Sequence, residues 1–118
     1  MPYVNVVPSL QVESFDDTVH WYERLFARPP DRRPMDGCVE WQLASTGGIQ
    51  IFRNPDSPAP ATVILGLEDV SAEVDALRER GIATDPFDVP SGQFRLAQLR
   101  DPAGNTVILS QDLSAPRD

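Results

Sequence analysis

The sequence predicts an α+β fold made of two βαβββ modules in one chain, and three observations lead to this prediction. Two stretches have the apolar spacing of an amphipathic helix, and each is followed by short strand-like runs. A shift of 55 positions places Leu10 on Leu65 and Glu13 on Glu68, so the halves look duplicated. Each half also ends in a glycine-containing turn and a β-rich run. A chance alternation of helix and strand patterns is the alternative explanation of the repeat.

The two helices are predicted within residues 11–26 and 67–81. In the first stretch, the residues at helical spacing are Phe15, Val19, Tyr22 and Phe26. In the second stretch, they are Val70, Val74 and Leu77. Ser14 and Asp69 are well placed to be N-caps, and Gly81 to close the second helix.

Strand-like runs flank a turn in each half. In the first half, the runs are 38–45 and 49–52, and the turn is 46–48. In the second half, the runs are 94–100 and 106–109, and the turn is 101–105. Proline cannot continue a helix or fill a central strand, so the proline-rich segments 27–37 and 53–61 are predicted to be connections. The second strand of each module is therefore poorly marked.

Length and charge limit the classes of function. A chain of 118 residues fits a single domain, 1–118, with modules at about 1–55 and 60–114. The formal net charge of -8 would repel a nucleic-acid backbone and favour cationic small molecules near a cleft. We therefore expect a small-molecule ligand, and neither a nucleic acid nor a membrane as partner.

The expected location is the cytoplasm. The N-terminal residues MPYVNVVPSL do not resemble a secretory signal, and no apolar run approaches the roughly 18 residues of a membrane span. The single cysteine, Cys38, rules out an internal disulfide and is expected to be a buried packing residue.

The order of these motifs resembles the vicinal oxygen chelate superfamily, which includes glyoxalase I, extradiol dioxygenases, fosfomycin-resistance enzymes and bleomycin-resistance proteins. The matching stretches are FDDTVHWYERLF (15–26), GGIQIF (47–52), LEDVSAEVDALRERGI (67–82) and DPAGNTVIL (101–109). The resemblance runs over nearly the whole chain. It implies paired βαβββ modules whose curved mixed sheets surround a cleft, commonly completed in a homodimer.

Superfamily members with metal chemistry hold a divalent ion on four strand positions. The resemblance places these positions at Val7 and Thr62 in the first strands, and at Gln50 and Ile108 in the last strands. A divalent ion needs several nitrogen, oxygen or sulfur donors. Valine and isoleucine offer none, so we expect no metal ligands and no cofactor, and the metal-dependent activities of the superfamily are in doubt.

Glu40 is the one weak candidate for a catalytic residue. Strand alternation places Trp41 on one face, expected to pack against a helix, and Glu40 on the other, toward the cleft. A carboxylate buried there would have a raised pKa and act as a general base, whereas a carboxylate at the rim would not. The only histidine, His20, is expected to be solvated, because it lies away from the apolar face of its helix.

The first strand predicts a mixed concave surface. Val4, Val6, Leu10 and Val12 are expected to face the helices, and Asn5, Val7, Ser9 and Gln11 the cleft. A few polar groups among apolar ones suit a partly polar ligand, although a solvated sheet face would look the same. The predicted ligand-binding residues are Val7, Ser9, Trp41, Gln50, Phe52, Thr62 and Ile108. Trp41 or Phe52 would stack on the ligand if either faces inward.

These inferences predict a metal-independent protein of the bleomycin-resistance type that sequesters a small, cationic organic ligand as a homodimer. Two alternatives remain open. One is an enzyme of the superfamily, of lyase, isomerase or dioxygenase type, that uses Glu40 or unrecognised metal ligands. The other is a degenerate domain with no ligand.

Overall fold

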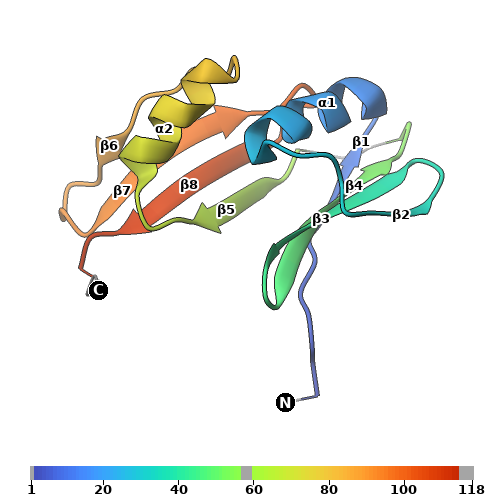
Figure 1. Ribbon diagram of the computed structural model, residues 1–118, viewed down its shortest axis with the longest axis horizontal. Helices are drawn as coiled ribbons and strands as arrows, with labels where there is room; N and C mark the ends of the chain where they lie inside the picture. Colours follow the sequence, from blue (N-terminus) through green and yellow to red (C-terminus); the bar gives the residue numbers. More distant parts are fainter. Residues whose placement is uncertain (1, 57–59, 115–118) are drawn as a thin grey trace.

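A computed structural model describes residues 2–56 and 60–114 as two consecutive modules, each with the order βαβββ (Figure 1). The first module comprises β1 (Ser9–Val12), α1 (Phe15–Phe26), β2 (Arg32–Met35), β3 (Cys38–Ala44) and β4 (Gly47–Arg53). The second comprises β5 (Thr62–Gly66), α2 (Val70–Glu79), β6 (Phe87–Asp88), β7 (Phe94–Arg100) and β8 (Thr106–Asp112). The predicted pair of βαβββ modules is confirmed.

Each module forms a four-stranded mixed sheet. The strand orders are β1-β4-β3-β2 and β5-β8-β7-β6, with the β1–β4 and β5–β8 pairs parallel and the others antiparallel. Both helices lie on the same side of the two sheets (Figure 1). We call the face of each sheet turned away from the helices its outer face. In this topology β1 and β5 are edge strands.

The predicted helix caps are mostly confirmed. Asp69 is the N-cap of α2, where its carboxylate accepts a hydrogen bond from the N–H of Ala72 at 3.0 Å. Gly81 has a φ of +83°, which allows the chain to turn sharply after α2. Ser14 holds the N-cap position of α1, but its side chain makes no capping bond.

A shared apolar core joins the helices to the sheets, and both modules contribute to it. Trp41 is only 1% exposed and faces α1, where its ring centroid lies 5.4 Å from that of Phe26 and 6.2 Å from that of Tyr22. Cys38 is also buried, as expected.

Polar contacts fix one module against the other. The buried Tyr22 hydroxyl of α1 donates to the Asp101 carboxylate in the β7–β8 turn at 2.8 Å. Arg80, after α2, donates to the carbonyls of Arg24 and Leu25 at the end of α1, at 2.6 and 3.1 Å. Burial, then the neighbouring charge of Asp101, raises the pKa of Tyr22, so this hydroxyl remains a donor.

Two sequence predictions in the first module are wrong. Val4 and Val6 are not buried against the helices: they are 85% and 71% exposed. They belong to an N-terminal arm that meets the first sheet at an isolated bridge between Val6 and Gly47. Beyond it the chain end extends away from the sheets (Figure 1). The segment 27–37 is not merely a connection, since it contains β2. Pro34 is compatible with β2 because that strand lies at the sheet edge.

Neither helix within the described residues is long and apolar enough to cross a membrane.

Candidate functional site

Four polar side chains cross the outer face of the first sheet in one row. Gln50 on β4 is level with Ser9 on β1 and with Glu40 on β3, and Arg32 on β2 is level with Glu40. The Ser9 hydroxyl donates to Gln50 Oε1 at 2.6 Å, and Gln50 Nε2 donates to Glu40 Oε2 at 3.2 Å. Arg32 donates to Glu40 Oε1 at 2.9 Å. We call these four residues the polar row.

The ion pair with Arg32 controls the charge state of Glu40. The hydrogen bond from Arg32 lowers the pKa of Glu40 below its ordinary value of 4.5, and partial burial opposes this shift only in part. A carboxylate with a lowered pKa is a weak base near neutral pH. Glu40 thus faces outward as the alternation predicts, but its environment suits an ion pair better than proton abstraction.

Further groups extend the polar row toward one end of the sheet. Gln11 Nε2 donates to the Ser9 hydroxyl at 3.0 Å, and Asn54 Nδ2 donates to Gln11 Oε1 at 3.3 Å. Phe52 is level with both Gln11 and Cys38, and its ring is half-buried. The outer face therefore combines oriented hydrogen-bonding groups with an aromatic ring.

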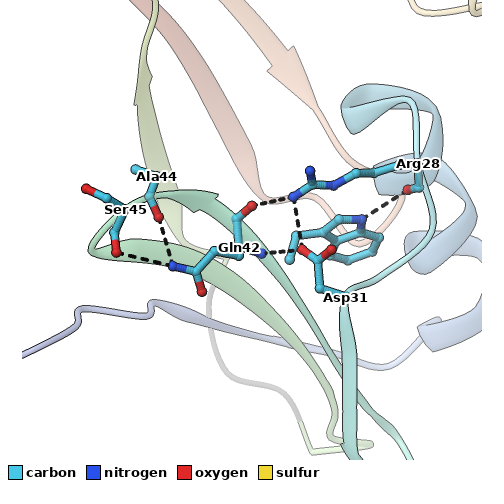
Figure 2. Close-up of polar contacts among 6 residues, drawn as sticks. Arg28, Asp31, Gln42, Ala44 and Ser45 are labelled. Atoms are coloured by element: carbon cyan, nitrogen blue, oxygen red, sulfur yellow. Dashed lines mark hydrogen bonds and ion pairs between the residues drawn. The ribbon is translucent and has the colours of Figure 1, made fainter.

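Trp41 lies outside this surface because it serves the core. Its indole N–H donates to the carbonyl of Arg28 at 3.1 Å. Arg28 in turn donates to Asp31 at 2.9 Å and to the carbonyl of Gln42, and Asp31 accepts from the N–H of Gln42 at 2.7 Å (Figure 2). This network fixes the segment between α1 and β2 against β3. Stacking on a ligand would require the Trp41 ring to face the cleft, but the ring faces the core instead.

The corresponding row in the second module is mainly apolar. Ile108 on β8 is level with Ile64 on β5 and with Gln98 on β7. Ile64 is 68% exposed and apolar. Ser9, at the corresponding position of the first module, donates a hydrogen bond to Gln50 instead. We call Ile64, Ile108 and Gln98 the second row.

The strand register determines which residues lie side by side on neighbouring strands. Gln50 is level with Ser9 rather than with Val7, and Ile108 is level with Ile64 rather than with Thr62. Thr62 is level with Thr106. The four positions named in the sequence therefore do not lie at one level of the two sheets.

Two hollows adjoin the predicted residues. One of about 440 Å³ lies between the modules and is lined by Thr62 and the rest of β5, by the arm at Val6 and by the β3–β4 hairpin. A smaller one of about 200 Å³ is lined by Val7, Glu40 and part of Trp41, among others. Of the predicted residues, Ser9, Gln50 and Phe52 thus lie on the first outer face, and Val7 and Thr62 line the two hollows. Ile108 lies in the second row, and Trp41 lies in the core.

The donors at these positions do not fit a divalent ion. At the levels of Gln50 and Ile108, the oxygen donors are one hydroxyl, the amide carbonyls of Gln50 and Gln98, and the Glu40 carboxylate, which is already bonded to Arg32. Across residues 2–56 and 60–114, no group of three or more His, Cys, Asp or Glu side chains is placed to hold a metal. His20 is exposed on α1.

Arg32 is the site residue that sequence reasoning missed, because it lies in the proline-rich segment taken for a connection. The available signal was that proline is compatible with a strand at a sheet edge, so Pro34 did not exclude a strand at Arg32. Ile64 was missed as well, since counting from Leu65 selected Thr62 instead.

Comparison with known proteins identifies the fold. The chain matches no protein-family model and no curated protein sequence. A glyoxalase/bleomycin resistance protein from Catenulispora acidiphila is similar in structure, with a TM-score of 0.84 and 24% identity over 96% of this chain and 99% of that one. The protein therefore has the fold of the vicinal oxygen chelate superfamily.

Two further structures share this fold. A bleomycin-binding protein complexed with bleomycin has a TM-score of 0.75 and 23% identity, covering 92% of this chain and 98% of that one. Lactoylglutathione lyase from Agrobacterium tumefaciens has a TM-score of 0.70 and 19% identity, covering 94% and 96%. One is described as a binding protein and the other as an enzyme, so the fold alone does not assign an activity.

Proposed function

We propose that this protein binds and sequesters a small organic molecule, without a metal, over the outer face of its first module and the adjoining surface of the second. The polar row is the observation that carries this proposal. Its side chains hold one another in fixed orientations beside the half-buried Phe52. A few placed polar groups next to apolar surface are typical of small-molecule sites.

The proposed ligand-binding residues come from both modules. They are Val7, Ser9, Gln50, Phe52, Thr62 and Ile108. Trp41 is left out because it is buried against α1. The engagement of Glu40 by Arg32 supports binding rather than catalysis. A bleomycin-binding protein has the same fold, so this fold can bind such a ligand.

A cationic ligand remains part of the proposal. The net charge of -8 favours the approach of cations, and the Phe52 ring offers a face for a cation–π contact. The pairing of Glu40 with Arg32 means that this preference rests on the overall field rather than on a free carboxylate in the polar row.

A homodimer is proposed as the working form. The N-terminal arm supports this, because Tyr3, Val4 and Val6 are 76%, 85% and 71% exposed and contribute no core in their own chain. Apolar surface left in water favours a partner, here a second copy. The cytoplasmic location stays a prediction that rests on the free, buried Cys38.

A thermal-shift screen in the presence of EDTA tests the proposed function. The panel contains metal-free bleomycin, other organic cations and neutral metabolites. A compound present at 100 times its Kd should stabilise the protein by about 2.7 kcal/mol. We expect at least one stabilising compound, and a smaller stabilisation of the Gln50→Ala variant. Absence of any stabilisation, or stabilisation only after a divalent ion is added, would contradict the proposal.

A further inference from the structure

Strand β5 presents an open hydrogen-bonding edge to the cleft between the modules. At the two ends of β5, the Thr106 N–H donates to the carbonyl of Ala61, and the Leu67 N–H donates to the carbonyl of Ser110. In a parallel pair, backbone bonds to the neighbouring strand come from alternate residues. The odd-numbered residues of this segment therefore bond to β8, and the N–H and C=O groups of Thr62, Ile64 and Gly66 point the other way.

No other strand within the described residues pairs with this edge, because β5 is the outermost strand of its sheet. The three residues are exposed. An open edge with unpaired backbone groups is a ready template for another extended chain.

Among the described residues, no charged side chain lines the cleft beside this edge. Its volume is about 440 Å³, within the usual range for sites of small ligands. Its lining comes from β5, from the arm near Val6 and Pro8, and from the β3–β4 hairpin. Thr62 supplies the only side-chain hydroxyl that the described part of the chain contributes to the lining, so most polar recognition here must come from the backbone.

Gly66 leaves room for a close approach of another backbone. A Cβ atom built on Gly66 would meet nothing within 4 Å. On the opposite side, the cleft is lined by the backbone of Gly47 and Gly48 in the hairpin. Exposed Ile64 and Leu43 add apolar contact surface.

We propose that the cleft takes an uncharged, extended, peptide-like molecule, which adds to β5 as a further strand. Its amide groups would bond to the open N–H and C=O groups of Thr62, Ile64 and Gly66. At about 3.3 Å per residue, these groups span roughly 13 Å, the length of a short peptide. This inference rests on the proposed function, and assigns a chemical class to the part of the ligand that lies between the modules.

A short molecule fits this edge better than a second copy of the chain does. The hairpin and the arm bound the cleft on the sides away from β5. A folded sheet edge would need that space to be open, whereas a single extended peptide would not.

The test uses calorimetry with the capped tripeptide Ac-Val-Thr-Val-NH2 and with its fully N-methylated form as the matched control. The inference predicts that the capped tripeptide binds and that the N-methylated form does not, because methylation removes the amide donors. Equal binding of the two peptides would overturn it.

Two variants of one residue separate backbone from side chain. Ile64→Pro removes an N–H from the open edge and leaves the bonds to β8 in place, whereas Ile64→Ala keeps that N–H. We expect Ile64→Pro to weaken tripeptide binding at least about tenfold, and Ile64→Ala by about threefold or less. Circular dichroism checks that both variants fold. Equal losses in the two variants would overturn the backbone assignment.

The remaining outcomes keep the two proposals distinct. If a compound of the thermal-shift panel binds but the tripeptide does not, the peptide class is wrong and the proposed function stands. If neither binds, the proposed function fails too. If sedimentation shows that Ile64→Pro dissociates a dimer, the edge belongs to a second copy and the peptide assignment is overturned.

Discussion

The two modules share a backbone arrangement but carry different chemistry on their outer faces. In the polar row of the first module, every member is hydrogen-bonded to a neighbour. At the same sheet positions the second row offers two isoleucines and a glutamine, and Ile64 is 68% exposed. The first module can therefore orient a ligand through side chains, whereas the second offers apolar surface and an open backbone edge. Duplication of the fold has not duplicated the site.

The largest expected effect concerns the core beneath each outer face. Trp41→Ala should lower the free energy of unfolding by about 3–5 kcal/mol, and Leu99→Ala, at the corresponding position of the second module, by about 2–5 kcal/mol. Urea denaturation measures both. A small loss for Trp41→Ala, together with a loss of ligand binding, would return Trp41 to the ligand surface.

A glycine in each module gives the next largest contrast. A Cβ on Gly48 would lie 2.2 Å from the Trp41 carbonyl oxygen, so Gly48→Ala should force β3 and β4 apart and cost about 1–3 kcal/mol. Gly66→Ala meets nothing within 4 Å and should change stability by at most about 0.5 kcal/mol. Similar losses in the two variants, measured by urea denaturation, would contradict this account of the hairpin.

The contact between modules should have a smaller effect. Tyr22→Phe removes the donor to Asp101, which keeps its bond from the Asn105 side chain at 2.9 Å. We expect a loss of about 1 kcal/mol on denaturation with an unchanged m value. Tyr3→Phe, on the exposed arm, is the control and should have no effect. No loss in Tyr22→Phe would mean that this bond does not help to join the modules.

The smallest effect is the pH dependence of the polar row. The pKa of Glu40 is lowered in the folded state, so its pairing with Arg32 stabilises the protein above the ordinary pKa of glutamate. This contribution is lost as the pH falls through the lowered pKa. Glu40→Gln, which gives the first module the residue found at Gln98, should be slightly less stable than the natural chain at pH 7. That difference should disappear in acid, and a difference that grows in acid would contradict the assigned direction.

Local sequence patterns were enough to predict the helices and the duplication. The spacing of apolar residues predicted a helix within residues 11–26, and the observed α1 lies inside that stretch. Asp69 and Gly81 mark the ends of α2 through short-range bonds and backbone geometry. Strand alternation also placed Glu40 and Trp41 on opposite faces, which the burial of Trp41 confirms.

The register between neighbouring strands could not be predicted from local sequence patterns. Which residue lies opposite Gln50 depends on long-range pairing between β1 and β4. The sequence named both Val7 and Ser9 as candidates, and only the strand register shows that Ser9 lies beside Gln50. Val4 and Val6 precede the regular β1–β4 pairing, and Val6 makes only an isolated bridge to Gly47, so both residues remain exposed although the alternation continues through them. Arg32 was hidden by Pro34, which only an edge strand accommodates.

The most direct test of the central claim is calorimetry, in EDTA, with the compound that stabilises the protein most in the thermal-shift panel. The claim that the polar row orients the ligand predicts an affinity about tenfold lower for Gln50→Ala. It predicts an unchanged affinity for Gln98→Ala, which removes the exposed glutamine of the second row. Equal losses in the two variants, or binding that appears only when a divalent ion is supplied, would contradict the account.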